Sequence, residues 1–255
     1  MLALAAVTLV VCAPGSPGSS SEAQPAMDAL AASLAQAAHL PAGSVAAVYE
    51  ETEPGGLRRL ADKDAVLLLA TLPFFLAHEQ ELRLVPRLSA VPEGGTPLER
   101  WTLVTGKDHP PSLDGYKVQS SAGYSKRFVR AAAPKLSRAV EIEPLAAVLS
   151  ALRRAANGDK VALLLDGSQS AALATLPFKD SLAVVGSSPP MPVALVATLS
   201  KRMDEHRWKA LEAAFLRLAE DRAARAALDG VRMAGFVPLD EQALSAARLA
   251  YRRAR

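Results

Sequence analysis

The pattern of apolar and polar residues alternates between short continuous apolar runs and longer stretches with helical spacing. The apolar runs have strand length and are rich in Val, Leu and Ala; they occupy residues 7–12, 44–49, 64–69, 83–90, 101–105, 161–165 and 183–185. Stretches with helical spacing separate many of them, for example at residues 21–40 and 144–157. This alternation is typical of mainly parallel sheets with helices on both faces. The pattern therefore predicts an α/β protein.

The first apolar run has two interpretations. Residues 2–12 have the length of a secretory leader core, but no Lys or Arg precedes them and a clean small-residue cleavage site is missing. Residues 7–12 alone are typical of a buried parallel strand. We favour the strand, so that a leader is shortened, mis-started or absent. We expect no lipid on Cys12, because Val11 stands where a lipoprotein box requires a small residue.

Composition narrows the function classes. The chain has 255 residues, of which 50% are apolar and 22% charged, and this suits one large or two modest globular domains. The net charge is only +3 and no basic stripe with interleaved aromatics occurs, so we expect no nucleic-acid partner. Cys12 is the single cysteine and cannot form an internal disulfide. The four histidines lack the paired spacing of a metal site.

The informative positions are the ends of the expected strands, because ligands of open parallel sheets bind beyond their carboxyl ends. Three strand ends carry small hydroxylic residues: Ser16 with Ser19, Ser20 and Ser21; then Thr71; then Ser120, Ser121, Ala122 and Gly123. Each precedes an expected helix start, where free N–H groups favour an anion. Simple helix capping explains any one of them, but three such turns in one α/β chain favour a ligand site.

Other charged residues near these turns have open interpretations. Asp166 ends a buried strand, where it either accepts a bond from a ligand or caps the next helix. Lys126 and Arg127 lie one turn into the helix expected after Ser120, where they either reach an anion or remain exposed.

No enzyme signature is present in the sequence. Residues 167–170, Gly-Ser-Gln-Ser, lack the second glycine of a nucleophile elbow. The phosphate loop and the G-x-G-x-x-G turn are also missing. Cys12 lies inside an apolar run, where a thiol is inert. We therefore expect a protein that binds a ligand without a cofactor and without changing it chemically.

Three ordered segments resemble one family. They are Leu113–Val118 followed by Ser120–Tyr124, then Asp64–Phe75, then Ser188–Pro192 with Gly235–Asp240. The set is similar to the phosphate/phosphite/phosphonate substrate-binding proteins of ABC transporters, which have the type 2 periplasmic-binding fold. The serine cluster departs from that family's fuller Ser-Thr-Ser run. Tyr49, Phe74 and Tyr124 are the few aromatic residues available to line a cleft.

The resemblance implies two lobes, residues 1–102 with 196–255 and residues 103–195, joined by crossover strands near 101–105 and 193–196. A small anionic ligand would lie between the lobes. The contacts implied are Ser16, Ser19, Ser20, Thr71 and Phe74 from the first lobe and Ser120, Ser121, Ala122, Gly123, Tyr124 and Asp166 from the second. The expected protein is a periplasmic monomer that meets an ABC permease transiently.

Two other functions are compatible with such a clamp. One is a sensory module that reports the ligand to a signalling partner. The other is an enzyme on the same fold, with Asp166 or Tyr124 as general acid or base, which requires a strongly perturbed group in the cleft.

Overall fold

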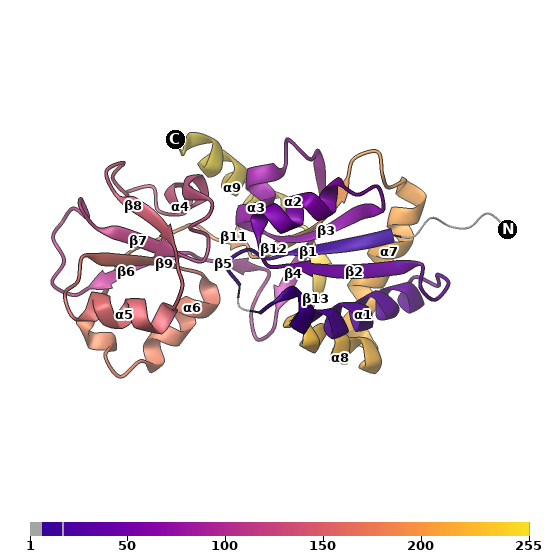
Figure 1. Cartoon of the computed structure of the whole chain (residues 1–255), viewed down its shortest axis with the longest axis horizontal. Helices are drawn as coiled ribbons and strands as arrows, with labels where there is room; N and C mark the ends of the chain where they lie inside the picture. The colour runs from indigo at the N-terminus through magenta and orange to yellow at the C-terminus, as the bar shows by residue number, and fades with distance from the viewer. Residues whose placement is uncertain (1–6, 17, 255) are drawn as a thin grey trace. The chain divides into compact units, whose positions relative to one another are not determined.

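The computed structural model describes residues 7–16 and 18–254, and the chain divides into two compact units. Unit 1 contains the residues up to Leu98 together with Pro192–Glu241, and unit 2 contains Glu99–Met191 together with Gln242–Arg255. The chain thus leaves unit 1 and returns to it (Figure 1).

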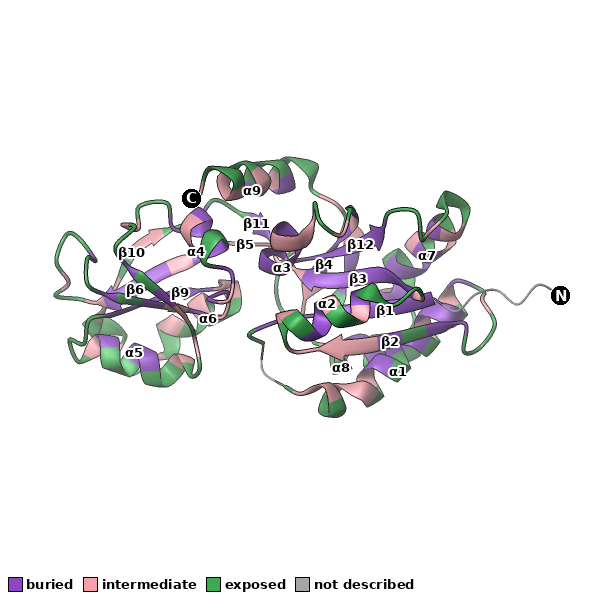
Figure 2. Ribbon diagram, turned by 45° about the horizontal axis from the view of Figure 1, so that its top comes forward, coloured by how far each residue is buried: buried purple, intermediate pink, exposed green. Residues whose placement is uncertain are grey.

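Unit 1 is built on a six-stranded sheet in the order β13-β4-β12-β3-β1-β2. Its strands are β1 (Val7–Cys12), β2 (Val45–Glu50), β3 (Ala65–Thr71), β4 (Leu84–Pro92), β12 (Ala194–Leu199) and β13 (Met233–Pro238). The expected first strand is confirmed, and all six of its residues are buried (Figure 2). The part of the possible leader at residues 2–6 lies outside the described residues.

Helices cover both faces of this sheet (Figure 1). They are α1 (Ser20–Ala37), α2 (Glu53–Ala61), α3 (Leu72–His78), α7 (Glu205–Arg217), η3 (Leu218–Glu220) and α8 (Arg222–Gly230). Helices α1, α7 and α8 share one apolar core with the strands, and Trp208, Leu211 and Phe215 of α7 are buried in it. At about 25 cal/mol per Å² of apolar surface, this burial is the main force that holds the unit together.

Unit 2 is built on a five-stranded sheet in the order β10-β6-β9-β7-β8. Its strands are β6 (Thr102–Gly106), β7 (Lys117–Ser120), β8 (Glu141–Pro144), β9 (Val161–Leu165) and β10 (Leu182–Ser187). Its helices are α4 (Lys126–Ala132), α5 (Val148–Ala156), α6 (Gly167–Ala172), η1 (Leu173–Thr175), η2 (Lys179–Ser181) and α9 (Glu241–Arg253). Leu152 and Ala155 of α5 belong to one apolar core cluster with Val104 and Leu163.

The α/β class is confirmed, but both sheets are mixed rather than mainly parallel. Strands β1, β2 and β3 pair in parallel, as do β7, β8 and β9. The remaining strands pair antiparallel with their neighbours. The return crossing brings the chain back to a sheet already begun, and β12 enters it antiparallel to β3 and β4.

The chain crosses between the units earlier than the sequence indicates. Expected crossover strands near 101–105 and 193–196 are instead β6 and β12, which are internal strands of the two sheets. The crossings fall in the short paired strands β5 (Leu98–Glu99) and β11 (Met191–Pro192). Helix α9, which the sequence places in the first lobe, belongs to unit 2. The Arg127 guanidinium holds its end, donating to the carbonyl oxygens of Tyr251, Arg252 and Ala254.

Candidate functional site

In each unit the parallel strands end at one sheet edge, which we call the carboxyl edge. In unit 1, Cys12 at the end of β1 is in register with Glu50 of β2 and Ala70 of β3. In unit 2, Ser120 at the end of β7 is in register with Pro144 of β8 and Leu164 of β9. The carboxyl edges therefore carry the turns that the sequence selects as ligand contacts.

The crossing segments adjoin the same edges. Ala194, which begins β12 directly after the return crossing, is paired with Thr71 at the end of β3. Thr102, which begins β6 directly after the outward crossing, is paired with Leu165 at the end of β9. Within each unit, the hydroxyl-rich turns and the chain crossings therefore share one edge of the sheet.

The start of α1 is occupied by carboxylates of the chain itself. Ser19 caps the helix in a reciprocal capping box with Glu22. The backbone amide and the hydroxyl of Ser20 both donate to the Glu51 carboxylate, at 2.5 and 2.8 Å. Glu51 directly follows β2 and is a residue that the sequence analysis missed. A helix start favours an anion, and here Glu51 supplies one.

Other contacts expected in unit 1 differ in their accessibility. Ser16 is exposed in the turn after β1, where its amide donates to the carbonyl oxygen of Ala13. Thr71 stands before α3, and its buried hydroxyl oxygen has no hydrogen-bond partner among the described residues. Phe74 is fully buried, with its ring 4.8 Å from that of His78. Phe74 therefore presents no surface to a ligand.

The turn after β7 is not the helix start that the sequence indicates. Residues 121–124 form a tight turn, and α4 begins only at Lys126. Gly123 is required in this turn, because a Cβ at this position would lie 2.2 Å from the carbonyl oxygen of Glu143. The chain is closely packed at this turn, and α4 begins several residues later than the sequence indicates.

The hydroxyl of Ser120 is committed inside the protein. It donates to the carbonyl oxygen of Leu164 at 2.8 Å and accepts from the backbone amide of Ala122 at 3.2 Å, and the residue is fully buried. Ala122 is also buried, whereas Ser121 and Tyr124 are half-buried in the same turn. Ser121 is therefore the serine of this turn that offers a hydroxyl at the surface.

Asp166 lies at the same edge, at the start of α6. Its carboxylate accepts from the Gln169 amide at 2.8 Å in a capping box, so the capping interpretation is confirmed. Burial raises the pKa of Asp166 above its ordinary value, although the amides of Gln169 and Ser168 oppose the shift. A carboxyl with a raised pKa is more readily protonated and can then donate a hydrogen bond.

Glu99 is a second acidic residue at the start of α6 and was also missed. Its carboxylate accepts from the Gly167 amide at 2.8 Å. Burial raises the pKa of Glu99 to about 7, and the neighbouring charge of Asp166 adds to the shift while the Gly167 amide opposes it. The sequence gives no sign of this, because Glu99 follows a loop and comes 68 residues before Gly167.

Lys126 and Arg127 are both exposed. The Arg127 guanidinium lies over the Tyr251 ring, 4.6 Å from its centroid, in addition to binding the end of α9. Its role in the structure is to hold α9, which favours the structural interpretation of this residue.

Solved structures with the same fold cover nearly the whole chain. A Xanthomonas citri protein bound to ATP is 17% identical with a TM-score of 0.72, and the match covers 98% of each chain. A binding protein component of an ABC phosphonate transporter from Pseudomonas aeruginosa is 14% identical with a TM-score of 0.66, covering 99% of this chain and 88% of that one. The protein PhnD1 from Prochlorococcus marinus, in complex with methylphosphonate, is 11% identical with a TM-score of 0.64, covering 97% of each chain. No curated protein sequence matches the chain.

The fold is that of the type 2 periplasmic binding proteins. Residues 133–244 match the family model described as ABC transporter, phosphonate, periplasmic substrate-binding protein. The match confirms the resemblance that the sequence indicates. A small ligand and a membrane permease are the partners that this family implies.

The structure also bears on metal binding and on membrane-spanning helices. The described part of the chain contains no group of three or more His, Cys, Asp or Glu side chains arranged to hold a metal ion. Among the same residues, none of the helices has both the length and the apolar character needed to cross a bilayer.

Proposed function

We propose that the chain captures a small anionic ligand carrying a phosphonate or phosphate group, outside the cytoplasm, and passes it to an ABC permease. The observation that carries the proposal is the shared edge: in each unit the hydroxyl-rich turns lie where the parallel strands end and the chain crosses. Such edges collect helix starts and free N–H groups, which is where α/β sheets bind ligands.

The proposed contacts in unit 1 are Ser16, Ser19, Ser20 and Thr71. Ser16 is exposed, and the Thr71 hydroxyl is without a partner among the described residues, so both have bonding capacity to spare. Ser19 and Ser20 contribute the start of α1, provided that the ligand replaces the Glu51 carboxylate on Ser20. The expectation that the ligand lies between the two lobes stays a prediction.

The proposed contacts in unit 2 are the turn Ser120–Tyr124 and Asp166. Ser121 and Tyr124 supply half-buried side chains, while Ser120, Ala122 and Gly123 hold the turn in shape. The pKa of Glu99 is raised to about 7, and its carboxyl, when protonated, can donate a hydrogen bond to an anion instead of repelling it.

Two of the similar solved structures also support this ligand class. The Prochlorococcus marinus structure contains methylphosphonate and the Xanthomonas citri structure contains ATP, and both ligands carry anionic phosphorus groups. In our proposal the chain acts as a monomer, binds no nucleic acid and releases its ligand chemically unchanged.

Isothermal titration of the purified chain tests the proposal. Methylphosphonate, inorganic phosphate and ATP are compared with sulfate, acetate and arginine at one ionic strength. We expect saturable binding of at least one phosphorus anion and recovery of the same compound after denaturation. Specific binding of arginine or acetate alone, or conversion of the bound compound, would contradict the proposal.

A further inference from the structure

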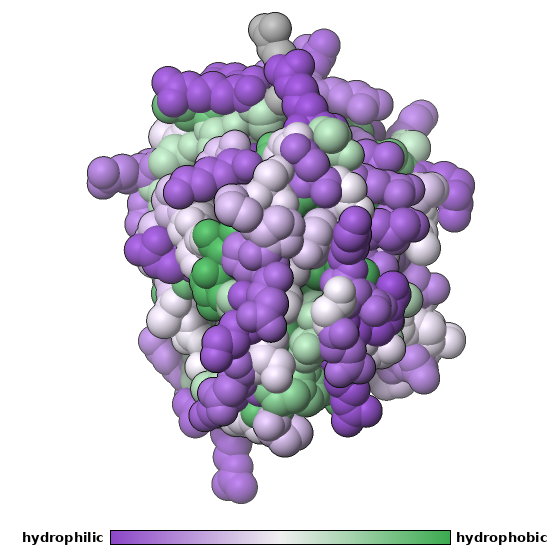
Figure 3. Space-filling model, turned by 90° about the vertical axis from the view of Figure 1, so that its left-hand side faces the viewer, coloured by the Kyte–Doolittle hydropathy of each residue, from purple (hydrophilic) through white to green (hydrophobic). Residues whose placement is uncertain are grey.

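Positive charge is concentrated in unit 2. This unit contains 16 Lys and Arg residues against 8 Asp and Glu, whereas unit 1 contains 13 against 18. The net charge of +3 is thus the sum of an acidic unit and a basic unit. Figure 3 shows that the surface at the end of unit 2 is mostly hydrophilic. A surface with excess positive charge attracts anionic partners, and the distribution of the acidic residues locates this surface.

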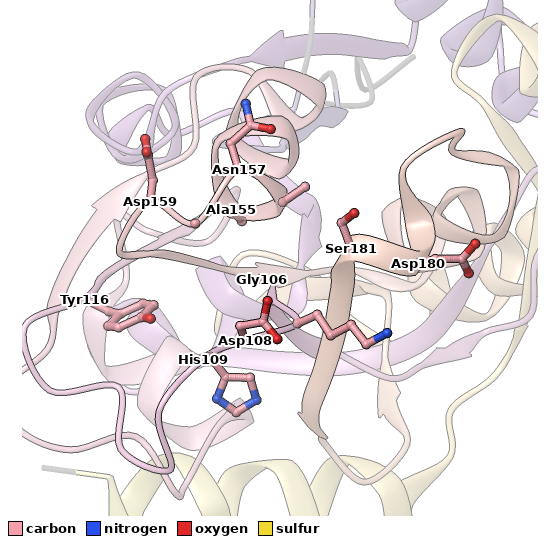
Figure 4. A pocket seen from close by; sticks show the side chains of 12 residues that line it. Gly106, Asp108, His109, Tyr116, Ala155, Asn157, Asp159, Asp180 and Ser181 are labelled. Carbon is pink, nitrogen blue, oxygen red and sulfur yellow. The ribbon is translucent and has the colours of Figure 1, made fainter.

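Most acidic side chains of unit 2 lie away from helices α4 and α9. Glu99 and Asp166 lie at the start of α6. Three others line a cavity of about 380 Å³ beside the end of β6 (Figure 4), and these are Asp108, Asp159 and Asp180. Residues 125–140, which include α4 and the loop after it, contain no Asp or Glu, and neither do residues 242–255. The excess positive charge of the unit therefore belongs largely to these two segments.

Two arginines hold α4, the loop after it and the end of α9 together. The Arg127 guanidinium donates to the last carbonyl oxygens of α9, and the end of α9 lies beside α4 in Figures 1 and 2. The Arg130 guanidinium donates to the carbonyl oxygens of Ser137, Arg138 and Val140 at 3.0, 3.3 and 3.4 Å. The basic residues of the loop and of α9 are thereby gathered around α4.

The exposed basic side chains around α4 have no counter-charge within the chain. We define the α4–α9 basic face by these side chains and one exposed leucine, namely Lys126, Lys135, Arg138, Leu249, Arg252 and Arg253. Within the described residues, none of the five basic side chains has an ion pair or a hydrogen bond, whereas Lys117 of the same unit pairs with Glu143 at 2.5 Å. Asp114 reaches the loop, where the Ser137 hydroxyl holds its pKa below the ordinary value, and it balances at most one charge. Like charges repel, so an external anion stabilises this face.

Leu249 adds an apolar contact to the basic face. Its side chain is 43% exposed, and it precedes Arg252 and Arg253 by three and four positions on α9, so the three share one side of the helix. An exposed apolar side chain among basic ones is typical of helices that lie on anionic bilayers. A nucleic-acid surface usually adds exposed aromatic rings, whereas the Tyr251 ring on α9 is covered by Arg127. The face therefore suits a bilayer better than DNA or RNA.

We propose that the α4–α9 basic face binds the anionic headgroups of a phospholipid bilayer. Its Lys and Arg side chains lie against lipid phosphate groups, and Leu249 enters the boundary between headgroups and acyl chains. Each basic side chain near an anionic surface strengthens binding by a factor of about five. Binding of this kind is reversible and weakens as the ionic strength rises. It does not depend on which ligand the chain carries, and so it is independent of the proposed function.

Sedimentation of the full chain with lipid vesicles tests the proposal. Vesicles of phosphatidylglycerol mixed with phosphatidylcholine are compared with vesicles of phosphatidylcholine alone, at low and at physiological ionic strength. We expect binding to the anionic vesicles only, and weaker binding at the higher ionic strength. R252Q/R253Q and K126Q/R138Q should each bind at least about tenfold more weakly than wild type, and L249S should weaken binding by a smaller factor. Circular dichroism confirms that each variant is folded.

A charge-matched control separates this face from the general positive charge of unit 2. The variant K107Q/K160Q removes two exposed basic side chains that belong to neither α4 nor α9, and it should bind nearly as well as wild type. The proposal is overturned if wild-type protein does not bind anionic vesicles, if it binds phosphatidylcholine vesicles equally well, or if K107Q/K160Q loses as much affinity as R252Q/R253Q. Tighter binding to duplex DNA of random sequence than to anionic vesicles, at the same phosphate concentration, would assign the face to a nucleic acid and overturn the proposal as well.

Discussion

The Glu51 carboxylate accepts both the backbone amide and the hydroxyl of Ser20, so the first turn of α1 already holds an anion. This turn is one of the proposed contacts for an anionic ligand. The chain therefore contains its own competitor for that position. Ligand and carboxylate cannot bond to the same amide at full strength, and the balance between them sets the affinity.

We predict that E51Q binds methylphosphonate about tenfold more tightly, because the neutral amide competes less well than the carboxylate for the helix start. Calorimetry of the two chains measures the change. E220Q removes an equal charge from an exposed position of the same unit and should have little effect. Equal or weaker binding by E51Q would show that Glu51 does not compete with the ligand.

We predict opposite consequences for two neighbouring serines. S120A removes a fully buried hydroxyl and leaves the Leu164 carbonyl oxygen and the Ala122 amide without it, so it should destabilise the fold by about 1–3 kcal/mol. S121A removes a half-buried hydroxyl and should weaken methylphosphonate binding without changing stability. Urea unfolding and calorimetry measure the two effects. Unchanged affinity in S121A would remove this serine from the site.

We predict that Glu99 makes the free energy of unfolding depend on pH. Its pKa is about 7 in the folded protein against an ordinary value of 4.5, so between these values the folded state holds more protons than the unfolded state. The contribution of Glu99 is therefore fully present below pH 4.5 and is lost as the pH rises to about 7, by at most about 1.4 kcal/mol per pH unit.

The measurement for Glu99 is the free energy of unfolding of wild-type protein and E99Q across this range. We expect their difference to change with pH, with E99Q gaining relative to wild type as the pH rises. E93Q, which removes an exposed carboxylate from unit 1, serves as the control. Parallel curves for wild type and E99Q would contradict the raised pKa.

We predict that Cys12 is inert in the folded protein. It is fully buried, and its pKa is raised to about 12 by burial and by the neighbouring charges of Glu50 and Glu53. Only roughly one thiol in ten thousand is then ionised at pH 8, and the thiolate is the reactive form. Mass spectrometry should find no alkylation by iodoacetamide in the native protein and complete alkylation in urea. Fast native labelling would show that β1 opens.

Gly56 is closely packed in the same part of unit 1, so a larger side chain does not fit at this position. A Cβ at Gly56 would lie 2.3 Å from the Cys12 sulfur and 3.4 Å from the Phe74 ring. We predict that G56A destabilises the fold by about 1–3 kcal/mol, because neither neighbour is exposed and able to move aside. Thermal unfolding measures this. The control is G186A, where no atom lies within 4 Å of the added Cβ, and a similar loss in both variants would contradict the argument.

The sequence by itself determined the local features of this protein. The runs at residues 7–12 and 161–165 are buried strands, as their continuous apolar pattern indicates, and the helical spacing at residues 21–40 corresponds to α1. Such features depend on residues within a few positions of one another. Pattern and propensity carry that information directly.

Only the tertiary structure decided which polar groups remain free for a ligand. Glu51 reaches Ser20 across 31 residues, Glu99 reaches Gly167 across 68, and Ser120 turns inward to Leu164 across 44. The direction of strand pairing was also decided there, since both sheets contain parallel and antiparallel pairs. The physical reason is that hydrogen bonds and burial depend on distances in space, and residues distant in sequence meet only after the sheets have formed.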